Sequence, residues 1–289
     1  MSDTGPAFSV EERRKSMSEL SIDQKPEGWE SVAKVYDLSF GSFTALFAQD
    51  ALRLVNVQPG QRILDVAAGT GGLSLAAAEA GAQVLATDFS PGMIDYLRSK
   101  VERKGIRGIS VAVMDGQALD VEDGSFDAAF SIFGLTFFPD RAAGFRELCR
   151  VIKPGGRAAV LSWGAMERLR FMSIILSTLK EVVPDFPAPK KPPPVLSLAD
   201  RTIFKSEMQA GGFAYVNMFT VAHIFTFSSP DVVYNSLDSA SPVVAGIFNN
   251  LAPNQREAFR RALNRKIQED QKEGPFGLEG EAHIAVGVK

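Results

Sequence analysis

The sequence predicts a doubly wound α/β fold, in which helices cover both faces of a largely parallel sheet. Short apolar runs alternate with helix-favouring segments between residues 62 and 163. The first run, residues 63–66, leads into the glycine-rich turn 69–72 and then into the alanine-rich segment 73–80. This order is typical of a strand, a tight turn and a helix.

The glycine turn and the acids that follow neighbouring strands predict a ligand. Glycine allows positive φ and lets a ligand approach the backbone, while the next helix points unpaired N–H groups toward it. The second predicted strand, residues 83–88, ends in Asp88, and the third, residues 109–114, is followed by Asp115. An acid at the tip of the second strand can accept hydrogen bonds from ribose hydroxyls. We therefore expect a nucleotide-like ligand; a purely structural turn is the alternative.

The remaining elements are predicted from the same patterns. Two helices precede the first strand, and strands four and five flank another helix. Beyond residue 163 the order is helix, proline-rich connection, helix, strand, several helices and a terminal strand. The expected ranges are 29–36 and 40–55 (helices), 126–133 (strand), 139–150 (helix), 158–163 (strand, after a turn at 153–156), 167–183 (helix), 184–194 (connection), 202–210 (helix), 214–227 (strand), 230–272 (helices) and 281–289 (strand).

The chain is long for one domain and short for two, which predicts one core with insertions. The expected division is a flexible tail at 1–27, N-terminal helices and the ligand-binding core at 28–163, a lid insertion at 164–198, a core helix and strand at 199–227, a helical lid at 228–272 and a terminal core strand at 273–289. Both insertions are rich in apolar residues. They are expected to cover a hydrophobic ligand, or alternatively to pack on each other or in a homodimer.

Composition excludes several classes of protein. Of the 289 residues 31 are basic and 34 are acidic, so a net charge of −3 gives no support for nucleic-acid binding. The single cysteine, Cys149, excludes an internal disulfide or a multi-cysteine zinc site, and we expect it to be a buried packing residue. No cluster predicts a bound metal. No apolar run approaches the ~20 residues of a membrane span, and no signal peptide is recognisable, so we expect a cytoplasmic protein.

Five segments in order, DVAAGTGG, ATDFSPGMI, MDGQAL, DGSFDAAFSIFGLTFFPD and RVIKPGG, resemble the class I S-adenosylmethionine-dependent methyltransferases. They are most similar to the subgroup related to ubiquinone and menaquinone biosynthesis methyltransferases, over residues 29–163. The resemblance implies a Rossmann-like seven-stranded sheet with an antiparallel last strand, and S-adenosylmethionine as cofactor with S-adenosylhomocysteine as product. A dinucleotide-dependent enzyme is the rival, but the turn over residues 67–72 reads AAGTGG, so a strict G-x-G-x-x-G motif is absent.

The resemblance also implies roles for individual residues. Asp65, Gly69 and Gly71 would hold the methionine part, Asp88 the ribose, and Asp115 with Gln117 the edge of the adenine. Phe89 and Met93 would lie against the adenine ring, although core packing also explains Met93. The further residues expected in the cofactor site are Ala67, Thr70, Gly116, Ser131 and Phe133.

Three residues are candidates for the chemistry of transfer. Tyr36 matches a position where related enzymes place a tyrosine near the methyl donor; an aromatic packing role is the alternative. Glu167, just past the fifth strand, and His223, in the sixth, are candidate bases. Their structural alternatives are an exposed carboxylate at a helix N-terminus and a strand residue outside the pocket.

The expected activity is methyl transfer to a small, hydrophobic or aromatic metabolite at oxygen, nitrogen or carbon, mainly through proximity and desolvation. The D/N-P-P-Y sequence of enzymes that methylate exocyclic base nitrogens or glutamine amides is absent after the fourth strand, where residues 131–135 read SIFGL. Two alternatives remain open: a protein or RNA methyltransferase, and a catalytically silent regulator that binds S-adenosylmethionine.

Overall fold

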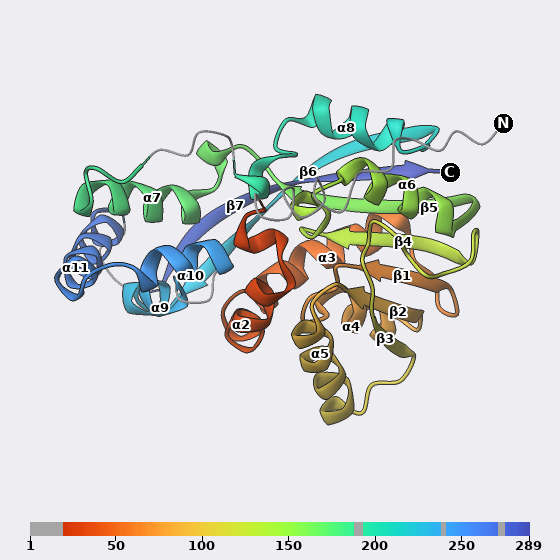
Figure 1. Cartoon of the computed structure of the whole chain (residues 1–289), viewed down its shortest axis with the longest axis horizontal. Helices are drawn as coiled ribbons and strands as arrows, with labels where there is room; N and C mark the ends of the chain where they lie inside the picture. Colours follow the sequence, from red (N-terminus) through yellow and green to blue (C-terminus); the bar gives the residue numbers. More distant parts are fainter. Residues whose placement is uncertain (1–19, 188–192, 238–240, 271–274) are drawn as a thin grey trace, which may run out of the picture.

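The structure is a computed structural model that describes residues 20–187, 193–237, 241–270 and 275–289. Its centre is a seven-stranded sheet of order β3-β2-β1-β4-β5-β7-β6 (Figure 1). β7 is antiparallel to both of its neighbours, and the other neighbouring strands are parallel. The predicted fold class, including the antiparallel last strand, is confirmed.

The strands are β1 Arg62–Val66, β2 Gln83–Asp88, β3 Ile109–Val113, β4 Phe126–Ile132, β5 Ile152–Trp163, β6 Tyr215–Phe227 and β7 Phe276–Val288. The helices are α2 Pro26–Tyr36, α3 Ser42–Val55, α4 Gly72–Glu79, α5 Pro91–Lys104, α6 Arg141–Val151, α7 Arg170–Val182, α8 Arg201–Ala210, α9 Pro230–Ser236, α10 Pro242–Asn249 and α11 Pro253–Asp270. Short 3-10 turns add η1 Ile22–Gln24, η3 Leu135–Phe137, η4 Met166–Arg168 and η5 Pro194–Leu196.

Two buried apolar clusters cover the two faces of the sheet. Successive strand residues point to opposite faces, so Ile63 belongs to the cluster under α3, α4 and α7, whereas Leu64 belongs to the one under α6 and α8. Both residues are fully buried. A parallel strand covered on both faces needs such a continuous apolar run. Cys149 belongs to the second cluster, as expected for a packing residue.

The N-terminal region is more ordered than predicted. Residues 1–19 of the expected tail lie outside the described residues, but η1 and the first turn of α2 fall within the range predicted to be flexible. Asp23 is 3% exposed, and its carbonyl accepts a hydrogen bond from Nε1 of Trp29 at 2.8 Å. The sequence shows no periodicity there because this packing is tertiary. A five-residue π-helical turn, η2 Asp37–Gly41, joins α2 to α3 without a break.

Two further predicted boundaries were wrong. Residues 153–156 are not a turn but the beginning of β5, and the pairing of β4 with β5 shifts register between Phe126 and Ala128. β7 begins at Phe276, five residues before the predicted start, and pairs with β6 without interruption from Phe276–Phe227 to Val288–Tyr215. Glycines in the first half of β7 concealed this strand, because glycine is depleted in strands.

The β6–β7 hairpin therefore extends beyond the core sheet. The pairing of β5 with β7 ends at Trp163–Ala282, while β6 and β7 continue together for six more residue pairs. Helices α7, α9, α10 and α11 gather around this extension (Figure 1). They belong to the two segments predicted as lids, and their action as lids stays a prediction. None of the helices in the described ranges is long and apolar enough to cross a membrane.

Candidate active site

The turn after β1 has the left-handed backbone that its glycines allow. φ is +57° at Ala67, +54° at Gly69 and +85° at Gly71. A Cβ on Gly71 would lie 2.2 Å from Cδ1 of Leu97, so only glycine fits against α5. A Cβ on Gly69 would meet nothing within 4 Å. Gly69 is therefore needed for its conformation, and the space beside it is open to a ligand.

Two buried carboxylates lie at the carboxyl ends of β1 and β2. Asp65 accepts a hydrogen bond from Oγ of Ser74 at 2.6 Å, and Asp88 accepts one each from the backbone N–H of Gly69 and Ser90 at 2.9 Å. Burial raises the pKa of Asp65 to about 7, with a further contribution from the charge of Asp88. Burial likewise raises the pKa of Asp88 to about 6, against the lowering effect of its backbone hydrogen bonds.

Among the described residues neither Asp65 nor Asp88 forms an ion pair. Charged carboxylates in such a setting are stabilised by a cation that lies close to them. The pair therefore suits a ligand that carries positive charge and hydroxyl groups. An S-adenosylmethionine molecule, with its sulfonium, ammonium and ribose hydroxyls, meets both requirements.

Tyr36, the last residue of α2, lies within reach of the charge of Asp88. Burial raises the pKa of its hydroxyl to about 12, and the charges of Asp37 and Asp88 act in the same direction. The hydroxyl forms a hydrogen bond with Thr44 of α3. The ring packs edge-on against Trp29, with ring centroids 5.9 Å apart. The structure thus places Tyr36 near Asp88, and its position beside the methyl donor stays a prediction.

An ion pair that the sequence did not predict ties the π-helical turn to α5 and to the glycine turn. Nζ of Lys100 lies 2.5 Å from Oδ1 of Asp37 and donates to the carbonyl of Thr70 at 3.3 Å. The hydroxyl of Tyr96 donates to Oδ2 of Asp37 at 3.0 Å. The Lys100 and Asp37 side chains are only 16% and 12% exposed. We call these four residues the latch, because they hold α2 and α3 against the turn.

The loop after β3 provides a second polar edge. Oδ1 of Asp115 accepts hydrogen bonds from both the backbone N–H and Nε2 of Gln117 at 2.9 Å, and Oε1 of Gln117 accepts from the backbone N–H of Asp140 at 2.7 Å. Gly116 between them is buried, and a Cβ there would lie 2.5 Å from the ring of Phe138. Phe89 is half-buried and Met93 is 2% exposed. Packing in the interior thus accounts for Met93 in the structure.

The end of β4 is strained where it meets the end of β1. Phe133 has φ +60°, an uncommon conformation for a bulky residue. A Cβ on the adjacent Gly134 would lie 2.3 Å from Cβ of Ala67. The hydroxyl of Ser131 accepts a hydrogen bond from the backbone N–H of Leu135 at 3.0 Å and holds the turn. Backbone strain of this kind clusters at ligand sites and is maintained by the surrounding structure.

An aromatic wall stands over these strand ends. Phe133 stacks on Trp163, the last residue of β5, with ring centroids 4.2 Å apart. Phe47 of α3 meets both rings edge-on, at 5.4 and 5.5 Å. The wall continues through further stacked or edge-on rings: Phe40, Phe43, Phe171 and Phe225. The spacing of Phe40, Phe43 and Phe47 was a signal for one helix face, but it could not indicate what that face contacts.

The two candidate bases, His223 and Glu167, lie in different surroundings. Nε2 of His223 is 2.6 Å from Oδ2 of Asp50, and the imidazole packs edge-on against Phe47. Phe47 is fully buried and lies between His223 and Phe133. Glu167 is exposed in η4, and in the described part of the chain no hydrogen bond or ion pair involves its side chain. The catalytic roles of both residues stay predictions.

The fold and the site together define a class of protein. Nucleotide-binding α/β enzymes that use an adenosyl cofactor share three features with this chain. These are a parallel sheet with one reversed strand, a glycine turn beside an acid, and an acid at the tip of β2. A family model described as a methyltransferase domain matches residues 63–156, which span β1 to the start of β5.

Known proteins identify the family. A demethylmenaquinone methyltransferase of Corynebacterium kroppenstedtii is 33% identical over 176 residues, which cover 58% of this chain and 74% of that protein. Two solved structures share the fold: the YcgJ protein from Bacillus subtilis (TM-score 0.54, 18% identity, 85% of this chain and 97% of that one) and Haemonchus contortus phosphoethanolamine N-methyltransferase 2 (TM-score 0.54, 19% identity, 90% and 57%). The chain belongs to the class I S-adenosylmethionine-dependent methyltransferases of the ubiquinone and menaquinone biosynthesis type.

Proposed function

We propose that this methyltransferase acts on a small, apolar, ring-bearing molecule that binds against the aromatic wall. The stack of Phe133 on Trp163 at the ends of β4 and β5 carries the proposal. Both rings lie at the carboxyl edge of the sheet, next to the strained turn that faces the glycine loop. An aromatic surface favours stacked or edge-on contact with another ring.

The cofactor assignment within this proposal follows the polar groups at the same edge. Asp65 and the left-handed turn at Ala67, Gly69, Thr70 and Gly71 would hold the methionine part. Asp88 would accept from the ribose hydroxyls, and Asp115 with Gln117 would meet the adenine edge, with Phe89 and Met93 against the adenine ring. The other residues of the proposed cofactor site are Gly116, Ser131 and Phe133. The two buried acids support this assignment, since within the described residues they have no cation of their own.

The main contribution of the protein to methyl transfer would be to align the acceptor with the methyl group. S-adenosylmethionine supplies an activated methyl group on a sulfonium, which is transferred in line to a nucleophile. The chain's aromatic wall would exclude water and orient the acceptor, and aromatic faces also favour a nearby cation. Tyr36 would hold its neutral hydroxyl at the acid pair, because its raised pKa keeps it protonated.

The relatives support an acceptor of this class. Several are named demethylmenaquinone methyltransferases, and they include proteins of Corynebacterium and Streptomyces species. The acceptor implied by that name has an aromatic ring, so we propose a hydroquinone-like molecule as the first acceptor to test.

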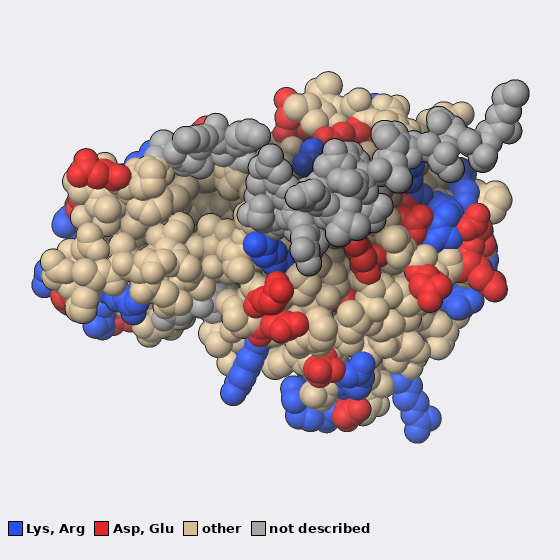
Figure 2. Space-filling model, viewed as in Figure 1, with Lys and Arg blue, Asp and Glu red and all other residues tan. Residues whose placement is uncertain are grey.

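The charge distribution on the face seen in Figure 2 does not favour RNA as the acceptor. Lys and Arg are interspersed with Asp and Glu there, without a continuous basic stretch.

The proposal is tested by incubating the protein with methyl-labelled S-adenosylmethionine and, in parallel, a panel of hydroquinones and catechols, a total peptide digest and total RNA. We expect label only in the small-ring fraction. The Trp163→Ala variant should raise KM for the acceptor about 5- to 12-fold, through loss of ring contact worth roughly 1–1.5 kcal/mol. It should leave the Kd for S-adenosylhomocysteine within about 2-fold.

The matched variant Asp88→Asn should have the opposite profile. It removes the charge but little volume, and we expect the Kd for S-adenosylhomocysteine to rise about 10- to 100-fold, as for a lost charged hydrogen bond. Label in RNA or peptide, or tight cofactor binding with no acceptor labelled, would contradict the proposed activity.

A further inference from the structure

The outer edge of the sheet is formed by a strand that lacks the usual protection. β6 has thirteen residues, YVNMFTVAHIFTF, none of which is Lys, Arg, Asp, Glu or Pro. In the described part of the chain β6 pairs with β7 alone. Proteins normally block a long edge strand with charges, proline or a covering element, because it is a template for pairing with another chain.

Both faces of this edge are partly open along its middle. From Asn217 to Ile224 no residue of β6 is buried. Phe219 on one face is 37% exposed and Ile224 on the other is 62% exposed. Large apolar side chains on both faces of an open edge are expected where a further strand continues the sheet.

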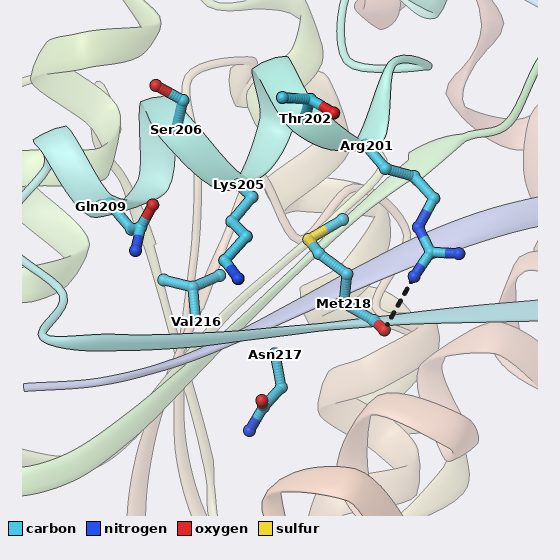
Figure 3. A pocket seen from close by; sticks show the side chains of 8 residues that line it. All are labelled: Arg201, Thr202, Lys205, Ser206, Gln209, Val216, Asn217 and Met218. Carbon is cyan, nitrogen blue, oxygen red and sulfur yellow. Dashed lines mark hydrogen bonds between the residues drawn. The ribbon is translucent and has the colours of Figure 1, made fainter.

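The hydrogen-bonding direction of the edge can be assigned from its neighbours. The backbone N–H of Gly164 donates to the carbonyl of Glu281, and the N–H of Lys289 donates to the carbonyl of Gly156, so the odd-numbered residues of β7 form their hydrogen bonds with β5. Backbone groups of successive strand residues point to opposite neighbours, so the even-numbered residues of β7 form theirs with β6. Ala282 is paired with Val221, so their partners are the odd-numbered residues of β6. The even-numbered residues of β6 therefore direct their N–H and C=O groups outward. Consistently, the carbonyl of Met218 accepts from Nη2 of Arg201 at 3.1 Å (Figure 3).

A groove lies along one end of this edge. It is formed by α8 and the first residues of β6, with Arg201, Lys205, Val216 and Met218 among its lining (Figure 3). Its volume is about 480 Å³, against roughly 30 Å³ for one water molecule, so it can hold a large side chain. The groove is apolar toward the strand and basic toward the helix.

We propose that β6 pairs antiparallel with β6 of a second copy of this chain, about a twofold axis at Val221. This axis lies at the midpoint of the strand and gives the longest pairing. Met218 then pairs with Ile224 of the second copy, which places that exposed isoleucine in the groove beside Met218. The outward groups of the even-numbered residues of both strands are satisfied, and the two sheets become one.

Charge supports the antiparallel direction. Arg201 and Lys205 flank the Val216–Met218 end, while Glu279 pairs with Ile224 in β7 and shares its face. Glu279 is 45% exposed and lies 3.4 Å from Arg168. Antiparallel pairing brings the basic end of each copy toward the acidic end of the other, twice by symmetry. Parallel pairing would place like charges together, which is unfavourable.

Engineered cysteines test the register. On the axis, Val221 faces Val221 of the other copy as a pair without mutual hydrogen bonds, with Cα atoms about 4.5 Å apart, within disulfide range. We expect Val221→Cys to give a covalent dimer on oxidation. The matched variant Phe219→Cys, two residues away on the same face, should not, because its sulfurs would be about 13 Å apart. The single native cysteine, Cys149, is buried and is retained in both variants.

Sedimentation velocity tests the association itself. We expect the protein to be a dimer and Ile224→Lys to raise its dissociation constant about 100-fold or more. The control is Val113→Lys, which places the same charge at a similarly exposed residue, 51% exposed, on the opposite edge strand β3. It should leave the dimer intact. A monomeric wild-type protein, or a dimer unaffected by Ile224→Lys, overturns the proposal, and neither result bears on methyl transfer.

Discussion

The latch offers the most decisive test of how the N-terminal helices serve the cofactor site. We consider Asp37→Asn, Lys100→Met and the double variant. Lys100 contacts both Asp37 and the carbonyl of Thr70, so it connects the π-helical turn to the glycine turn. Because both side chains are largely buried, the pair is a charge-assisted hydrogen bond worth about 1.5–3 kcal/mol. If cofactor binding requires the latched arrangement, each single variant loses this free energy from cofactor binding, because it must adopt the same arrangement without the hydrogen bond.

The expected result is a rise of about 10- to 100-fold in the Kd for S-adenosylhomocysteine, since each 1.4 kcal/mol is tenfold. Titration calorimetry measures this directly. The double variant should be no weaker than the worse single variant, because the two residues act through one interaction. Fully additive losses would refute the reasoning.

A control comes from the same helix. Arg98 and Asp95 form an ion pair on α5 whose side chains are 47% and 71% exposed. An exposed pair contributes at most about 1 kcal/mol, and within the described residues no hydrogen bond or ion pair joins these two side chains to the turn. Arg98→Met should therefore change the Kd less than about 3-fold. An equal loss in this variant would mean that the latch has no special role.

Three further predictions follow from the site and its neighbours. Burial raises the pKa of Asp65 from an ordinary 3.8 to about 7, so between these pH values the folded protein binds a proton that the unfolded chain releases. The free energy of unfolding without cofactor should therefore fall as the pH rises from about 4 to about 7. Chemical denaturation measures this slope, and Asp65→Asn should make it less steep. Gly134→Ala should destabilise the protein because its Cβ would clash with that of Ala67. Ala67→Gly removes that Cβ and the positive φ of a non-glycine residue, so it should be neutral or stabilise by about 1 kcal/mol and should restore the stability of Gly134→Ala. Thermal unfolding of the double variant tests this, and a lack of rescue would show that the strain lies elsewhere. Phe47→Ala should lower the unfolding free energy by about 3–5 kcal/mol, since the ring is fully buried between His223 and Phe133; a loss below about 1 kcal/mol would show that the aromatic wall collapses to fill the space.

Much of the core could be predicted because its signals are local. The apolar run before Val66, the glycines that follow it and Asp88 at the end of β2 lie in short segments whose conformations depend on their own residues. The hydroxyl of Ser90 accepts from the backbone N–H of Met93 at 3.3 Å and caps the start of α5, which has proline in its first turn. These elements needed no long-range information.

The features that were not predicted depend on contacts between distant segments. Asp37 and Lys100 are 63 positions apart, and nothing in either segment indicates the other. The meeting of Phe47 with Trp163 arises in the same way. The early start of β7 was hidden because Gly277 and Gly280 weaken its pattern, although both residues pair with β6.

The unbroken ladder between β6 and β7 has a mechanical consequence. Thirteen successive residue pairs run from the level of the core strands into the helical group around α7 and α11. The helical group is therefore joined to the core sheet by a continuous hydrogen-bonded ribbon, and not only by side-chain packing.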